Sequence, residues 1–397
     1  MEAKVCACSG EDMNQTVKLY ENDSYVKDFK AIVVRCESKG KGYEVVLDKT
    51  AFFPEGGGQN ADTGWIGSAK VTDVKERQGV IYHQTDIPVE AGTVIEGHID
   101  WARRFDYMQQ HSGEHIVSGI VHRKLAYDNV GFHLGDGIVT LDFNGELSAD
   151  DLEDVEQEAN QAVFENRDII VSYPDQAQLE RMDYRSKIEI AGQVRIVTVD
   201  GYDVCACCAP HVLKTGEIGL IKILSCQKYK GGVRLSIACG RRALEDYKVK
   251  QKNVSDISVL LSAKPELTAA AVEKLHQDMQ ALKFRIGALQ EKMMMDKAAA
   301  LSSDAVNVCL FEEDMDTIIM RKTVNAMTAV HAGYCGMFSG SDEKGYKFLI
   351  GTSGCDARNA MNALKEHFTC RGGGSKEMVQ GQISGEKDAI EAIFRAM

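Results

Sequence analysis

Two histidines four residues apart, His111 and His115, constrain this chain more than any other feature. Apolar residues recur with helical periodicity from about residue 101 to about residue 125, and residues i and i+4 lie on one face of a helix. Both imidazoles can therefore face a single metal ion. Pairs at this spacing also arise by chance, so the pair alone does not establish a metal site.

A second pair with the same spacing, Cys207 and His211, lies much further along the chain. Gly201, Pro210 and Gly216 place this pair on a loop between two strands. A thiolate and three imidazoles are a tetrahedral donor set that Zn²⁺ binds readily. We therefore predict one zinc ion per chain. Its ligands would be His111, His115, Cys207 and His211.

The neighbouring thiols Cys205 and Cys208 could replace Cys207 as ligands. Cys207 is preferred because its spacing to His211 repeats the spacing of the helical pair. The chain has 12 cysteines, but residues 1–10 hold no signal-peptide core and no run of about 18 apolar residues occurs. We therefore expect a cytoplasmic protein without membrane contact, in which the cysteines are free thiols or metal ligands.

The order of the periodic segments predicts an α+β fold. Residues 1–98 hold β-branched and aromatic runs broken by Gly, Asp and Asn, which indicates a small barrel or sandwich, and we predict a small β-barrel. Residues 99–243 would form a zinc-binding α+β domain. Residues 244–300 would form a helical hairpin or coiled coil, and residues 301–397 would form a compact α/β domain.

Residues 272–293 carry an apolar seam with alternating spacings of three and four. The seam consists of Val272, Leu275, Met279, Leu282, Ile286, Leu289 and Met293. This repeat is typical of a coiled coil, so it predicts a homodimer through this segment. Packing against a hairpin partner in the same chain is the alternative. Pro265 marks the start of the helix, because proline is tolerated in the first helical turn.

The net charge of −13 argues against a polyanionic partner, since phosphate binding needs Lys and Arg. Basic residues nevertheless outnumber acids from Lys222 to Lys252, whereas residues 146–158 contain acids and no base. One interpretation is a face that binds nucleic acid beside a face that repels it, and the other is two solvated surfaces. The predicted phosphate contacts are Lys228, Lys230, Arg234, Arg241 and Arg242.

Further motifs surround the two ligand pairs. Residues 50–59 read TAFFPEGGGQ, residues 215–219 read TGEIG, and residues 372–381 read GGGSKEMVQG. In this order, the motifs and the ligand pairs resemble the editing domain of alanyl-tRNA synthetase and its free-standing AlaX relatives. The last motif is similar to the C-terminal domain that this synthetase shares with DHH phosphoesterases, as in the long form of AlaX. The resemblance covers nearly the whole chain.

The resemblance implies a cytoplasmic, ATP-independent hydrolase that removes serine, and possibly glycine, from mischarged alanine tRNA and so protects translation fidelity. No segment matches the aminoacylation domain of the family, so the chain is not expected to charge tRNA. Thr50 would bind the serine hydroxyl, Gln59 would contact substrate or RNA, and Glu114 could act as general base. The glycines Gly56, Gly57 and Gly58 would line the pocket or simply form a turn.

Each role has a structural alternative. Thr50 is also an ordinary strand residue, and Glu114 could be an exposed helical side chain that faces away from the metal.

The family loop usually reads Cys-Gly-Gly-Thr-His, whereas Cys208, Ala209 and Pro210 fill its middle here. Pro210 has no N–H, so a backbone donor at that position is lost.

Two other classes of protein fit parts of the sequence. His111 to His115 also matches the H-x-x-E-H pattern of some zinc metallopeptidases, with an acidic ligand supplied by Glu153, Glu156 or Glu158. That reading leaves Cys207 and His211 unexplained. A tRNA-binding protein without catalytic activity, in which four ligands close a structural zinc site, is the third class. Ligand number alone does not decide between a catalytic and a positioning zinc.

Overall fold

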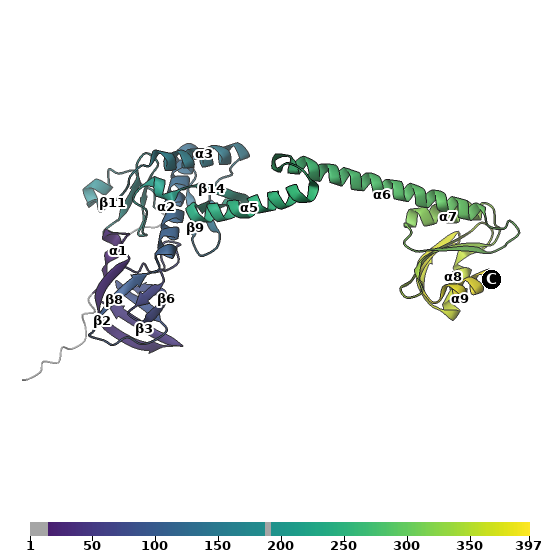
Figure 1. The fold of residues 1–397 in the computed structure, drawn as a ribbon, viewed down its shortest axis with the longest axis horizontal. Helices are drawn as coiled ribbons and strands as arrows, with labels where there is room; N and C mark the ends of the chain where they lie inside the picture. The colour runs from purple at the N-terminus through teal and green to yellow at the C-terminus, as the bar shows by residue number, and fades with distance from the viewer. Residues whose placement is uncertain (1–14, 187–191) are drawn as a thin grey trace, which may run out of the picture. The chain divides into compact units, whose positions relative to one another are not determined.

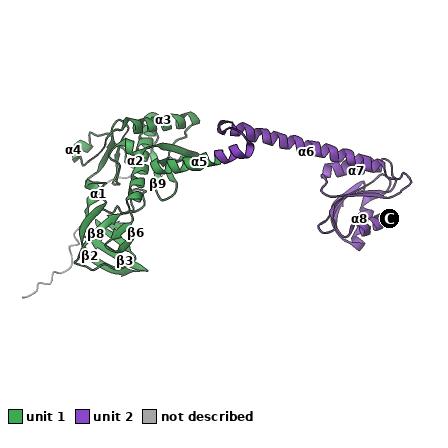
Figure 2. Cartoon of the chain, in the orientation of Figure 1, with its two compact units in different colours: residues 1–253 green, residues 254–397 purple. Residues whose placement is uncertain are grey.

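The computed structural model describes residues 15–186 and 192–397. The chain divides into two compact units, residues 1–253 and residues 254–397 (Figure 2). Residues 1–10, for which the sequence predicts no signal-peptide core, lie outside the described residues. Helices and strands mix in both units, which confirms the α+β class. The finer division at residues 98, 243 and 300 stays a prediction.

A six-stranded barrel opens the first unit, with the strand order β2-β3-β7-β6-β5-β8 closing on itself (Figure 1). Its strands are β2 (Asp28–Lys39), β3 (Gly42–Leu47), β5 (Gly64–Ile66), β6 (Ala69–Arg77), β7 (Val80–Thr85) and β8 (Val94–Ile99). Buried and exposed residues alternate along the first half of β2, so one face of the strand points into the barrel. Beside it lie β1 (Val17–Lys18), α1 (Leu19–Asn22) and β4 (Lys49–Thr50).

A long helix, α2 (Trp101–Leu125), forms the centre of the first unit. The Asp100 side chain caps its N-terminus by accepting a hydrogen bond from the Arg103 amide, and Ala126 ends it in the left-handed conformation with φ of 56°. Every residue from Tyr107 to Val121 is buried. The helix is therefore covered on all sides and can present side chains to an interior site.

Two antiparallel sheets and a second helix surround α2. The sheets have the orders β14-β15-β10-β9 and β11-β12-β13, and α2 contacts β13 in one and β15 in the other. The remaining elements of this part are β9 (Asn129–His133), β10 (Val139–Phe143), α3 (Ala149–Glu165), β11 (Ile169–Ser172), α4 (Gln176–Leu179), β12 (Ile196–Val199), β13 (Asp203–Ala206), η1 (Thr215–Ile218), β14 (Ile221–Tyr229) and β15 (Gly232–Cys239). Ser148 and Asp151 form a capping box at the start of α3, which carries most of the acids of residues 146–158.

Two long helices follow, α5 (Gly240–Leu261) and α6 (Thr268–Ala299), with the short turn η2 (Pro265–Leu267) before α6. The seam residues of α6 are 39–60% exposed, which is at odds with their burial in a hairpin of the same chain. The Met294 side chain, just beyond the seam, is buried in a cluster with residues of α7 (Thr317–Thr328). The seam therefore lies on a face of α6 that the described part of the chain leaves uncovered.

A five-stranded sheet with helices on both faces completes the second unit (Figure 1). Its order is β16-β17-β18-β20-β19, from β16 (Val308–Glu312), β17 (Tyr334–Ser341), β18 (Gly345–Thr352), β19 (Thr369–Gly374) and β20 (Met378–Ser384). Neighbouring residues of β17 serve opposite faces: Met337 packs with α7, and Phe338 packs with α8 (Ala357–His367) and α9 (Lys387–Ala396). No helix among the described residues is long and apolar enough to span a bilayer.

Candidate metal centre

The four predicted ligands lie together in the first unit. One ligand atom from each of His111, His115, Cys207 and His211 lies within 4.8 Å of the others. The two histidines occupy successive turns of α2, and the other pair lies on the loop that follows β13. The Cys207 Sγ is 3.6 Å from His111 Nε2 and 3.4 Å from His211 Nε2. The spacing in the sequence thus corresponds to one cluster in space.

Each imidazole of the cluster uses its Nδ1 for a hydrogen bond. The pairs are His111 with Gln59 Oε1 at 2.8 Å, His115 with Asp203 Oδ2 at 2.8 Å, and His211 with Ser112 Oγ at 3.1 Å. An ionised carboxylate and an amide oxygen only accept, so Nδ1 of His111 and of His115 carries the proton. The Nε2 atoms of these two rings are left to bind a metal ion, as metal-binding histidines require.

Burial and neighbouring charges set the protonation of the cluster. Burial alone would raise the pKa of the Cys207 thiol, but the adjacent His111 and His211 imidazoles lower that pKa well below its usual value. Burial lowers the pKa of His211 to about 3. Burial also opposes charge on His115, yet its hydrogen bonds to Asp203 and Cys207 raise its pKa well above the usual value. A metal ion binds a thiolate and neutral imidazoles, so its binding would displace the additional proton that the raised pKa of His115 favours, and the resulting donor set fits a tetrahedral ion.

The two alternative thiols lie elsewhere. Cys205 is buried, and its Sγ groups with His115 and Asp203 rather than with the four-residue cluster. Cys208 is exposed, and a Cβ added to Gly57 would lie 3.7 Å from its Sγ. The geometry therefore favours Cys207 as the thiolate of the cluster.

Glu114 is buried with 1% exposure, so the alternative of an exposed helical glutamate is wrong. Its Oε1 accepts hydrogen bonds from Ser118 Oγ at 2.8 Å and Asn129 Nδ2 at 2.6 Å. Its Oε2 lies 3.9 Å from His115 Nε2. The carboxylate is thus held rigidly on the metal-binding side of the His115 ring.

The glycine-rich segment, residues 50–59, packs against α2. The buried Arg104 of α2 donates from Nε to both oxygens of Asp62, at 3.1 and 3.0 Å, and Asp62 in turn accepts from the Phe53 amide. Gly58 adopts φ of 83°, and a Cβ there would lie 2.4 Å from the Phe132 carbonyl oxygen, so only glycine fits. This packing brings the next residue, Gln59, against α2.

Gln59 has one satisfied and one unsatisfied side-chain atom. Its Oε1 accepts from His111, whereas its buried Nε2 has no hydrogen-bond partner among the described residues. Gly56 and Gly57 form the turn before it, with the Gly56 amide donating to the Gln59 carbonyl at 3.1 Å. A buried donor without a partner beside a metal cluster is typical of a position that a bound group completes.

Thr50 is fully buried, and its hydroxyl is committed to a residue that the sequence did not single out. The Thr50 Oγ1 lies 2.8 Å from His83 Nε2 and accepts from the Phe52 amide at 3.1 Å. His83 Nδ1 lies 3.0 Å from the Val45 carbonyl oxygen and must donate to it, so Nε2 accepts the Thr50 proton. Burial lowers the pKa of His83 to about 4, which keeps the ring neutral. The sequence did offer a signal for this residue, because His83 stands among the apolar residues of the strand Val80–Thr85.

Three of the five predicted basic contacts are paired with acids. Arg234 makes a two-pronged ion pair with Asp142 at 2.6 and 2.7 Å, and Arg242 pairs with Asp106 at 2.6 Å. Lys228 lies 3.0 Å from Glu146 but stays 84% exposed. The ammonium of Lys230 lies 5.1 Å from the Tyr229 ring, and Arg241 is exposed at the start of α5. Acids distant in the sequence therefore offset much of the local positive charge.

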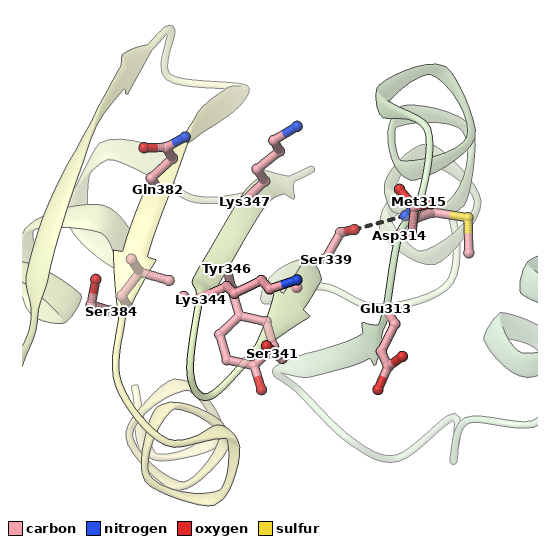
Figure 3. Close-up of a pocket in the computed structure, with 13 residues that line it drawn as sticks. Glu313, Asp314, Met315, Ser339, Ser341, Lys344, Tyr346, Lys347, Gln382 and Ser384 are labelled. Carbon is pink, nitrogen blue, oxygen red and sulfur yellow. Dashed lines mark hydrogen bonds between the residues drawn. The ribbon is translucent and has the colours of Figure 1, made fainter.

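A cavity of about 520 Å³ lies in the second unit (Figure 3). Glu313 and Asp314 line one part of it, and Lys344 and Lys347 line another. Figure 3 also shows the hydrogen bond from the Met315 amide to Ser339 Oγ, 2.8 Å long. None of the predicted site residues lines this cavity, and its walls carry charges of both signs.

Two segments of the chain match known families. Residues 11–103 match the family described as class II (A) tRNA synthetases. Residues 194–235 match the second additional domain of threonyl and alanyl tRNA synthetases, and this segment includes Cys207 and His211. The two matches cover the barrel and the loop of the candidate metal centre.

Similar curated proteins are named alanine–tRNA ligase. The protein from Ignicoccus hospitalis is 28% identical over 96% of this chain and 42% of its own length. The protein from Natronomonas pharaonis is 33% identical over 80% of this chain and 36% of its own length. The chain therefore spans less than half the length of these relatives. A solved structure of RecJ from Thermus thermophilus matches 34% of this chain and 19% of its own, with 18% identity and a TM-score of 0.24.

Proposed function

Because this chain belongs to the alanyl-tRNA synthetase-like family of editing proteins, we propose that it is a zinc-dependent hydrolase of mischarged alanine tRNA. The observation that supports this most is the convergence of a thiol and three imidazoles beside the glycine-rich segment. The substrate would be the ester that joins serine, or glycine, to the terminal ribose. Hydrolysis of that ester releases the amino acid and requires no ATP.

His111, His115, Cys207 and His211 would hold the zinc ion, which when bound would polarise the ester or orient the attacking water. Glu114 would accept a proton from that water and return it to the leaving ribose oxygen. Its position supports this role, because Ser118 and Asn129 hold its carboxylate beside His115. Gln59 would donate its unpartnered Nε2 hydrogen bond to an ester oxygen.

Serine would be distinguished from alanine at Thr50. The Thr50 proton is directed to His83, so only a lone pair remains on its oxygen. That lone pair would accept the serine hydroxyl proton, which alanine lacks. A site built for a hydroxyl rejects the analogue without one far better than a site that selects by size. Glycine has no side chain to fill the space beside Thr50, so a water molecule could take the place of the hydroxyl there, and glycine would be released more slowly by the same machinery.

The tRNA would contact basic side chains that retain exposed charge. Lys228, Lys230 and Arg241 are exposed, and the ion pair of Lys228 lies at the surface, where such pairs are weak. The ion-paired side chains of Arg234 and Arg242 would contribute less. Because counterions leave the RNA when lysine and arginine bind phosphate, the affinity for tRNA would fall as salt rises.

The metallopeptidase alternative finds little support. Glu156 pairs with Lys222, and Glu158 pairs with Arg123 and Lys124, so these carboxylates already have partners. The loop ligands also fill the positions that an acidic ligand would need. Editing therefore remains the proposal that the geometry supports best.

Deacylation of three purified substrates tests the proposal. Alanine tRNA carrying serine, glycine or alanine is mixed with the zinc-loaded protein, and release of the amino acid is followed over time. We expect rapid release of serine, slower release of glycine and little release of alanine. Release no faster than in buffer would refute the proposed hydrolase activity. If the protein still bound tRNA in that case, a tRNA-binding protein with a structural zinc would be the better proposal.

A further inference from the structure

A second buried cluster lies on the outer side of His115. Ligating atoms of His115, Asp203 and Cys205 lie within 4.8 Å of one another. The Asp203 carboxylate accepts from His115 Nδ1 at 2.8 Å. It also accepts from Arg185, whose Nε lies 2.7 Å from Oδ1 and whose Nη2 lies 2.9 Å from Oδ2. His115, Cys205 and Arg185 therefore all lie close to the buried carboxylate of Asp203.

This cluster is unsuited to a metal ion of its own. The Arg185 guanidinium is permanently charged and occupies both oxygens of Asp203, so it would repel a divalent cation at that place. His115 Nδ1 is likewise committed to Asp203, which leaves only Nε2 for a metal. The arrangement instead matches the outer hydrogen bonds that orient metal-binding histidines.

The backbone holds Arg185 in place from both sides. Its amide donates to the Val204 carbonyl at 2.8 Å, and its carbonyl accepts from the Ala206 amide at 2.9 Å, so it runs alongside β13. The side chain is only 12% exposed. A planar fork that donates twice to one carboxylate fixes the orientation of that carboxylate, which a single point charge does not.

A cavity of about 230 Å³ borders the other side of this ion pair, lined among others by Arg123, Arg185, Tyr202 and Asp203. Loss of the Arg185 guanidinium would open Asp203 to water from this cavity. The carboxylate could then turn toward solvent, and the hydrogen bond that orients the His115 ring would weaken.

We propose that Arg185 is a positioning residue of the metal centre, which fixes Asp203 and through it the ring orientation and tautomer of His115. The inference rests on the metal centre of the proposed function. Arg185 touches neither the ion nor the substrate. It raises metal affinity by holding one ligand in its binding geometry before the ion arrives.

Metal competition with a chromogenic chelator tests this proposal. The dissociation constant for Zn²⁺ is measured for the wild-type protein and for the variants Arg185→Gln, Arg185→Lys and Arg123→Gln. Loss of a direct hydrogen-bond partner of a metal ligand weakens binding about 10- to 100-fold, and Arg185 acts one step further out through Asp203, so we expect Arg185→Gln to weaken binding up to about tenfold. Arg185→Lys should recover part of the loss, since it restores charge without the fork. Arg123 lines the same cavity but bonds Gly201 and Glu158, so its variant should bind like wild type.

Asp203→Asn provides a second route if Arg185→Gln does not fold. It keeps the size of the side chain and one acceptor for His115, and it should also weaken metal binding. The absorption spectrum of bound Co²⁺ should change in both variants, because a shifted His115 alters the ligand field. Wild-type metal affinity and an unchanged Co²⁺ spectrum in Arg185→Gln, with only a lower melting temperature, would overturn the proposal. If the wild-type protein did not bind zinc, the metal centre of the proposed function would itself be refuted.

Discussion

At the scale of single residues, the direction of each hydrogen bond decides what the candidate site can recognise. Thr50 gives its proton to His83 and accepts from the Phe52 amide, so it can accept but not donate to a substrate. His111 and His115 likewise present Nε2 to the cluster because Gln59 and Asp203 occupy Nδ1. The atom that each of these side chains offers to a ligand is therefore set by a hydrogen-bond partner that is distant in the sequence.

Thr50→Val is predicted to slow serine release by up to about tenfold, because one hydrogen bond contributes roughly 0.5–1.5 kcal/mol. Valine keeps the shape and removes the hydroxyl. Glycine release should change less, since glycine has no hydroxyl to recognise. The measurement is the deacylation rate on both substrates. Equal slowing on serine and glycine would show that Thr50 supports the pocket in general, and no change on either would leave it a strand residue.

At the scale of elements, α6 presents apolar side chains that nothing in the described chain covers. Its seven seam residues are between 39% and 60% exposed. A helix of 32 residues is about 48 Å long, so the seam suits a partner helix of similar length. A second copy of the same seam is such a partner, and a repeat of three and four residues packs against its like.

We predict a homodimer through residues 272–293. Leu282→Lys with Ile286→Lys should raise the dissociation constant more than tenfold, since burial of one such side chain contributes about 1.5–3 kcal/mol and 1.4 kcal/mol is a factor of ten. Light scattering and sedimentation at micromolar concentration would measure it. Ala281→Lys, an exposed position outside the seam, is the matched control and should leave the dimer intact. A wild-type monomer, or a dimer that survives both lysines, would contradict the prediction.

At the scale of the whole molecule, two units have separate cores and only the first contains the candidate metal centre. The ligands come from α2 and from the loop after β13, so a bound ion joins two segments that are far apart in the sequence. A ligand that binds only the folded state stabilises that state. The second unit depends on its own sheet and its own two clusters of apolar residues.

Removal of zinc is therefore predicted to lower the melting temperature of the first unit and to leave that of the second unchanged. Calorimetry with and without chelator, with limited proteolysis to identify the unit that opens, would measure this. Cys207→Ala should reproduce the effect of the chelator and lose the metal by elemental analysis. The adjacent Cys208→Ala should retain both stability and metal, because that thiol is exposed. Full zinc content in a Cys207→Ala/His211→Ala variant would contradict the ligand set.

Local spacing was enough to predict the α+β class, the helix that bears His111 and His115, the start of the helix near Pro265 and the seam of α6. Such features depend on residues within one or two turns of each other. The resemblance to editing proteins was also readable, because its motifs keep their order along the chain.

Only the tertiary structure decided which groups meet. It buried Glu114, paired Arg234 and Arg242 with acids outside the basic segment, and placed His83 beside Thr50 and Arg185 beside Asp203. These partners are separated by many residues of chain, and no periodicity relates them. Charge and hydrogen bonding act through space, so their outcome follows from the packing of the elements and not from the order of the residues.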